Sequence, residues 1–278
     1  LKSSTTGGEN CAVGYIALQD NTTGDRNTAL GTFSLENNTT GNDNTAIGRN
    51  TLPANTTGAS NTAVGRDALA ANTTADNNTA VGYYALYQNT TGTTNNAFGR
   101  GALGAVTTAD SNSAFGDYAL QANTAAANSA FGYRALYTNT TGVNLVAVGK
   151  NALYANTTGS SNTAIGMQSL DANTTGGNNS AVGNDSLSAN TTGDNNTAVG
   201  SDALGNSSTG NRNTAVGKGA LLTNTTGSDN TAFGYAALDA QSTTSDNSAF
   251  GAYALTKNTT GVRNSGLGRA TLEENTTG

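Results

Sequence analysis

The chain has 278 residues, of which 35% are apolar and 11% charged, and its net charge is −6 with 12 Lys and Arg in total. The basic residues are scattered, so no stripe of positive charge can neutralise phosphates and nucleic acid is not an expected partner. The apolar runs are only a few residues long, so no membrane insertion is expected in this chain.

Leucine recurs every 17 residues along the whole sequence, and the spacing shortens once, to 16, between Leu120 and Leu136. Around each Leu the sequence approximates one cassette, N-T-A-V-G-x-x-A-L-x-x-N-T-T-G-x-x. A fixed period over the full length is typical of stacked copies of one supersecondary unit. Residues 1–278 are therefore predicted to form a single repeat array of 17-residue cassettes, with one 16-residue cassette near 121–136. The Leu column consists of Leu1, Leu18, Leu35, Leu52, Leu69, Leu86, Leu103, Leu120, Leu136, Leu153, Leu170, Leu187, Leu204, Leu221, Leu238, Leu255 and Leu272.

The first predicted element of each cassette is the pentad that starts at Asn-Thr-Ala, and it reads as a short β-strand that ends at Gly. The Gly, from Gly14 to Gly268, suits a corner that needs positive φ or close backbone approach. The residue before this Gly is always apolar, and we call these residues the outer apolar column. They are Val13, Leu30, Ile47, Val64, Val81, Phe98, Phe115, Phe131, Val148, Ile165, Val182, Val199, Val216, Phe233, Phe250 and Leu267.

The second predicted element is Asn-Thr-Thr-Gly, which has the composition of a turn. One strand and two corners make one coil, so the predicted fold is all-β, a parallel β-solenoid (β-roll) of about sixteen 17-residue coils. The Leu column and the outer apolar column are expected to form its apolar spine. The Asn residues that open the pentads, Asn27, Asn44, Asn61, Asn78 and their equivalents, are expected to form amide ladders. A leucine-rich repeat is the main rival, but its several Leu per unit are missing.

The two faces of the strand leave an alternative open, because adjacent strand residues point to opposite sides. Either a flat column of Ala faces outward, or Ala points inward and the outer apolar column is exposed. Such an exposed stripe exceeds what soluble monomers usually present. In both cases one face is smooth and uncharged, which favours self-association.

Two features depart from the regular cassette. Residues 123–128 lack one position, and Leu145-Val146 replaces an Asn-Thr pair. Either these departures produce a local kink in the coil, or they are sequence variation that a loop tolerates. Cys11 replaces a Thr and is expected to be a small buried side chain.

Catalytic chemistry is not indicated. The chain has no His and one Cys, which excludes Ser-His-Asp, Cys-His and His-based metal sites. The Glu273-Glu274 pair is interpreted as solvated charge. We therefore expect no enzyme, and no catalytic, cofactor-binding or metal-binding residues and no cofactor.

Two further binding modes follow from the corners. Asp residues beside Asn-Thr-Thr-Gly could place carboxylates for Ca²⁺ between coils, although wet turn residues are the favoured interpretation. These are Asp25, Asp43, Asp76, Asp110, Asp194, Asp229 and Asp246. Threonine columns suggest ice binding, but the two adjacent Thr of each corner point to different sides and can instead satisfy backbone groups.

The pentads resemble a known repeat. Asn61-Thr62-Ala63-Val64-Gly65, Asn112-Ser113-Ala114-Phe115-Gly116 and Asn162-Thr163-Ala164-Ile165-Gly166 are similar to the S-V-A-I-G repeats of trimeric autotransporter adhesin (YadA-like) heads and of phage-type tail fibres. The resemblance implies a left-handed β-roll, trimers, a surface-fibre role and binding to host matrix or cells. The period of 17 and the Thr or Ser of the pentad differ from the adhesin repeat.

The leading interpretation is a structural protein of an extracellular or cell-surface fibre, an adhesin shaft or filament subunit whose partner is itself, as a homotrimer or head-to-tail filament. Both ends are ordinary cassette sequence without capping units, which favours association or a longer parent chain. The alternative is a module that binds a glycan or host surface through tyrosines of the variable corners, and the second alternative is an ice-binding protein. These tyrosines are Tyr83, Tyr84, Tyr87, Tyr133, Tyr137 and Tyr154.

Overall fold

The computed structural model describes Ser3 and residues 5–277, and it confirms an all-β parallel solenoid. The chain forms two compact units, residues 1–140 and residues 141–278. The strands of the first unit are β1 (Cys11–Val13), β2 (Thr28–Leu30), β3 (Thr45–Ile47), β4 (Thr62–Val64), β5 (Thr79–Val81), β6 (Asn96–Phe98), β7 (Ser113–Phe115) and β8 (Ser129–Phe131). Those of the second are β9 (Val146–Val148), β10 (Thr163–Ile165), β11 (Ser180–Val182), β12 (Thr197–Val199), β13 (Thr214–Val216), β14 (Thr231–Phe233), β15 (Ser248–Phe250) and β16 (Ser265–Leu267).

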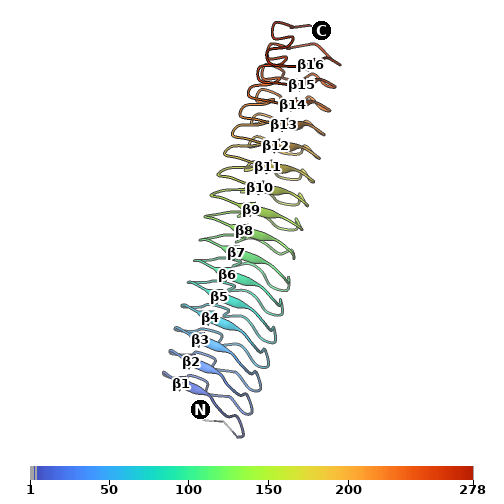
Figure 1. Cartoon of the computed structure of the whole chain (residues 1–278). Coiled ribbons are helices and arrows are strands. Elements are labelled where there is room, and N and C mark those ends of the chain that lie inside the picture. The colour runs from blue at the N-terminus through green and yellow to red at the C-terminus, as the bar shows by residue number, and fades with distance from the viewer. Residues whose placement is uncertain (1–2, 4, 278) are drawn as a thin grey trace. The chain divides into compact units, whose positions relative to one another are not determined.

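Within each unit, every strand pairs in parallel with the next one in sequence (Figure 1). The register joins equivalent cassette residues, for example Thr45 with Thr62 and Ala46 with Ala63. The shortened cassette keeps this register, because Ser113 pairs with Ser129. The missing residue is therefore taken up at the corner, where Asn123 Nδ2 donates to the carbonyl of Ala125 at 2.6 Å.

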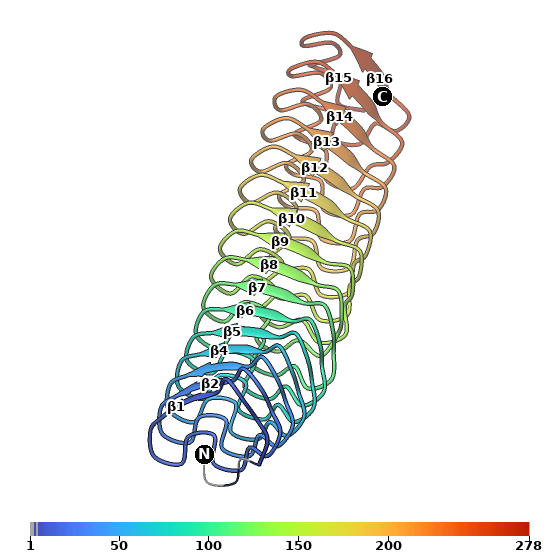
Figure 2. The same ribbon diagram turned by 60° about the horizontal axis from the view of Figure 1, so that its bottom comes forward.

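The Leu column forms the centre of each unit, as predicted. Every member of this column from Leu18 to Leu255 is 0% exposed. Leu272 is 47% exposed because no coil covers it in the structure, and Leu1 lies outside the described residues. Figure 2 shows the strands of each unit side by side, with the loops closing each coil behind them.

The outer apolar column is not part of this core, and the expectation that it joins Leu in the spine is wrong. The strand Ala residues point inward and are completely buried from Ala29 to Ala249. At Gly266, which replaces Ala, an added Cβ would lie 3.4 Å from Cγ of Leu255. Each coil thus holds one Leu, the strand Ala and the small residue before Leu in its interior, and a larger inward residue on the strand would overfill it.

The corners are built from left-handed backbone. The Gly after each strand has φ between 121° and 140°, and an added Cβ would in most cases approach backbone of the next coil to less than 3 Å. This confirms the predicted reason for Gly. Unexpectedly, the Leu column is also left-handed, with φ of 49° at Leu18 and 51° at Leu170. The positive φ turns the chain sharply, so that Leu and the residue before it are both buried.

Two columns of buried Asn hold consecutive coils together. In the first column, which opens the pentads, the side chain mainly bonds to backbone: Asn27 Nδ2 donates to Gly41 O at 2.8 Å, and the N–H of Asn44 donates to Asn27 Oδ1 at 3.0 Å. The second column, the Asn of Asn-Thr-Thr-Gly, forms an amide ladder in runs of consecutive coils. There Asn38 Nδ2 donates to Asn21 Oδ1 at 2.9 Å, and Asn55 Nδ2 donates to Asn38 Oδ1 at 2.8 Å.

Interruptions of the second Asn column leave polar atoms without partners. Asn89 Oδ1 is buried and unpaired where the next coil has Val106 in place of Asn. Asn224 Oδ1 is unpaired where the next coil has Gln241. Because a buried acceptor without a donor costs free energy, these coils are local weak points.

Candidate functional site

The outward side of the strands forms the first candidate surface, which we call the ladder face. It consists of the outer apolar column and of the first residue of each strand, mostly Thr or Ser, and it contains no charged residue. Twelve of the sixteen outer apolar residues are exposed, among them Val13 at 56% and Ile47 at 37%. Cys11 belongs to this face and is exposed, so the expectation of a buried Cys is wrong.

The ladder face has a regular internal order. Rings of the outer apolar column stack almost parallel, with centroids 4.6 Å apart for Phe98 and Phe115 and 5.3 Å apart for Phe233 and Phe250. Beside them run strand threonines whose hydroxyls have no hydrogen bond within the described part of the chain, such as Thr45. The face therefore combines ordered apolar groups with hydroxyls that remain available to a partner or to water.

The threonines of the Asn-Thr-Thr-Gly corners have a different role. The first Thr donates its hydroxyl to the carbonyl of the equivalent Thr in the next coil, at 2.9 Å from Thr22 to Thr39 and 3.0 Å from Thr39 to Thr56. This confirms, for the first Thr of each corner, the expectation that corner threonines satisfy backbone groups. The second Thr, such as Thr40, is exposed.

The corner aspartates bond to the chain itself. Asp76 Oδ1 accepts from the N–H of Ala59 at 2.7 Å, and Asp194 Oδ1 accepts from the N–H of Gly177 at 2.6 Å. Asp43 pairs with Arg26 at 2.7 Å, which lowers the pKa of the carboxyl chiefly through the hydrogen bond. Among the described residues, no group of three or more Asp, Glu, Cys or His side chains is arranged to hold a metal ion.

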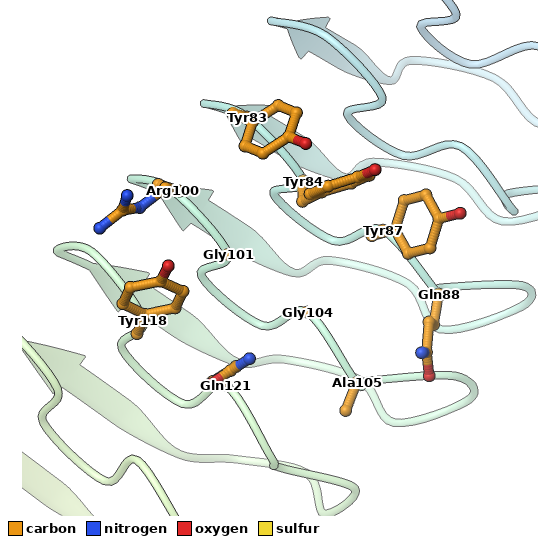
Figure 3. Close-up of a pocket in the computed structure, with 10 residues that line it drawn as sticks. All are labelled: Tyr83, Tyr84, Tyr87, Gln88, Arg100, Gly101, Gly104, Ala105, Tyr118 and Gln121. Carbon is orange, nitrogen blue, oxygen red and sulfur yellow. The ribbon is translucent and has the colours of Figure 1, made fainter.

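A second candidate surface lies at the corner that follows β5, β6 and β7, and we call it the tyrosine cleft (Figure 3). Its volume is about 280 Å³. Tyr83, Tyr84, Tyr87 and Gln88 project from the first coil, and Tyr118 and Gln121 project from the third. The middle coil contributes Arg100, Gly101, Gly104 and Ala105. The cleft exists because positions 101 and 104 of this coil carry no side chain where the neighbouring coils carry Tyr or Gln.

The walls of the cleft are fixed by contacts among their own side chains. Tyr84 lies with its ring centroid 4.1 Å from Tyr83 and 4.6 Å from Tyr87. The pKa of the Tyr84 hydroxyl is raised, chiefly because of its hydrogen bond with Tyr83. On the other wall the Arg100 guanidinium lies over the Tyr118 ring at 4.6 Å and pairs with Asp117 at 3.6 Å.

Three of the six predicted tyrosines meet at this cleft. Tyr133 and Tyr137 lie on another coil, where Arg134 contacts both rings. Tyr154 belongs to the second unit. The sequence prediction missed Arg100, Tyr118 and Gln121. The sequence does contain a signal for the cleft. Gly occupies positions 101 and 104, where the cassettes before and after have large side chains.

No helix among the described residues is long and apolar enough to span a membrane. Comparison of the sequence with protein-family models and with curated proteins gives no match.

Proposed function

We propose that the chain is a structural module of an extracellular or cell-surface fibre, and that copies associate side by side through the ladder face. The observation that carries the proposal is the outward direction of the outer apolar column, which leaves ordered apolar side chains uncovered on a face without charge. The fibre role and the location draw on the resemblance of the pentads to surface-fibre repeats.

The size of the face supports this association. Eight strands about 4.8 Å apart and three residues wide give each unit a face of roughly 400 Å² in projection. Apolar patches of a few hundred Å² mark interaction sites on soluble proteins. The absence of charged residues means that no charge has to be desolvated when this face is covered.

The test is the oligomeric state of the purified chain, measured by sedimentation velocity at tens of micromolar. The wild type is expected to be an oligomer, and the double variant Ile165→Lys/Val199→Lys a monomer with an unchanged far-ultraviolet circular dichroism spectrum. The matched control, Thr158→Lys/Thr192→Lys, adds the same charge at exposed corners of the same unit and should remain oligomeric. A monomeric wild type, or equal effects of both pairs, would contradict the proposal.

One observation favours ice binding as a second candidate. In β2 to β5 each strand presents a Thr hydroxyl and an aliphatic side chain, Thr28 with Leu30 through Thr79 with Val81, at the fixed spacing of the sheet. Such a repeat can order water on a flat face. A monomeric chain that shows thermal hysteresis, lost in Thr45→Lys, would support this function in place of the fibre.

A further inference from the structure

We propose that the tyrosine cleft is a binding site for a neutral carbohydrate, held with one apolar face of a sugar ring against the tyrosine walls. This site lies within a single unit and goes beyond the fibre role, since it requires neither the ladder face nor a second copy.

The shape of the cleft provides the first argument. Its floor is main chain at Gly101 and Gly104, and its walls rise from the coils on either side (Figure 3). Coils two steps apart are separated by about 9.6 Å. The Tyr118 ring lies against Gly101 of the middle coil, where an added Cβ would be 2.9 Å from Tyr118 Cδ1, so this ring closes one side of the opening. The volume of about 280 Å³ is at the small end of ligand sites and fits about one or two sugar rings.

The chemistry of the walls provides the second argument. Aromatic faces match the C–H faces of a sugar, and tyrosine hydroxyls with the amides of Gln88 and Gln121 can both donate and accept hydrogen bonds to its hydroxyls. This mixture of apolar surface and two-way polar groups suits a polyol better than an apolar ligand.

The charges of the cleft select a neutral ligand. Arg100 is its only charged lining residue, and the guanidinium is already paired with Asp117 and stacked on Tyr118. An acidic sugar would have to compete with the Asp117 carboxylate for this group. The walls are also prearranged by the contacts of Tyr84 with Tyr83 and Tyr87, so little side-chain ordering opposes binding.

The experiment uses the full chain and a panel of neutral probes: glucose, galactose, mannose, N-acetylglucosamine and their β1,4-linked disaccharides. Saturation-transfer NMR detects binding, and tyrosine fluorescence gives the dissociation constant, because the chain has 10 Tyr and no Trp. At least one probe is expected to bind. Tyr118→Ala should weaken its binding about tenfold or more.

Gly104→Gln is the sharper variant, because it fills the cleft without removing any wall. The equivalent residue in the next coil is Gln121, so the coil geometry accepts this side chain. An added Cβ at Gly104 would lie 3.2 Å from Gly101 O and 3.8 Å from Gln121 Cγ. Binding is expected to be lost while the melting curve stays unchanged. Tyr253→Ala is the matched control, since Tyr253 occupies the cassette position of Tyr84 and Tyr118 outside the cleft.

Binding that survives Gly104→Gln, or equal loss in Tyr253→Ala, would overturn the assignment of the site. If no sugar of the panel binds at millimolar concentration, the proposal that the ligand is a carbohydrate is wrong. A proline-rich peptide that binds at the cleft while sugars do not would identify the other ligand class that aromatic grooves accept. The ladder-face variant Ile165→Lys/Val199→Lys should bind the sugar normally, which separates this test from that of the fibre.

Discussion

The inside and the outside of the coil are built from the same short cassette but follow different rules. Inside, the Leu column, the strand Ala residues and the two Asn columns are fully buried from the coil of β2 to that of β14, and each is confined by the coils on either side. Outside, the outer apolar column is uncovered, and corner residues vary from Tyr to Gly within three coils. The comparison teaches that the interior carries the stability of the stack, whereas the exterior is available for binding.

The strongest test of this difference is a charge in the core. Leu170→Asp should destabilise its unit by about 3 to 5 kcal/mol, because the carboxylate would be buried without a partner. Urea denaturation followed by circular dichroism measures the change. Met167→Asp is the matched control on the exterior, where Met167 is exposed, and should change stability by no more than about 0.5 kcal/mol. Similar losses in both variants would remove the distinction between inside and outside.

The second test concerns polar groups of the interior. Asn72 Nδ2 donates to Asn55 Oδ1 at 2.9 Å, and Asn72 Oδ1 accepts from Asn89 at 3.0 Å. Asn72→Ala should therefore cost about 2 to 3 kcal/mol, because it leaves the buried Asn55 Oδ1 without its ladder donor and removes one of the two acceptors of Asn89 Nδ2, which keeps only Gly92 O. Thr74→Ala, at the exposed threonine of the same corner, should be nearly neutral in the same denaturation experiment. A neutral Asn72→Ala would show that the ladder does not stabilise the stack.

The third test repairs an interior defect. Val106→Asn should stabilise the first unit by about 1 kcal/mol, because the new amide can donate to the unpaired Asn89 Oδ1. Val106→Ala is the comparison, since it removes apolar contacts without providing a donor and should destabilise. Thermal melts of both variants decide between them. If the two variants shift the midpoint in the same direction, the orphaned acceptor is not the cause of the weakness.

The smallest effect is expected at Asp239, which lies at the boundary between the interior of its coil and the surface. Burial raises the pKa of the Asp239 carboxyl, whose Oδ1 has no partner. A raised pKa in the folded state means that the folded chain holds the proton more tightly, so stability is greatest below the ordinary value of 3.8 and falls as pH rises through the folded-state pKa. Asp239→Asn should then stabilise at pH 7 by about 0.5 kcal/mol, after allowance for screening by solvent. The gain should vanish in melts near pH 3, and a gain independent of pH would have another origin.

The sequence predicted most of the interior. The spacing of 17 residues between leucines indicated stacked coils, and the pentads with their Gly indicated strands and corners. The reason is that a repeat places each cassette position in the same environment in every coil, so the Leu column reports one shared environment. Apolar character alone did not decide burial, because the outer apolar column is equally regular and is largely exposed.

The tertiary structure decided what the repeat left open. Alternation along a strand shows that Ala63 and Val64 face opposite sides, but only the narrow interior, filled by Leu, selects Ala for the inside. The same holds for the tyrosine cleft. Tyr84, Gly101 and Tyr118 come together because coils stack in register, and the size of the gap depends on which side chains three neighbouring coils place at one corner. The sequence by itself thus determined which residues form columns. The packing of the folded chain decided which columns face inward and which side chains of neighbouring coils meet.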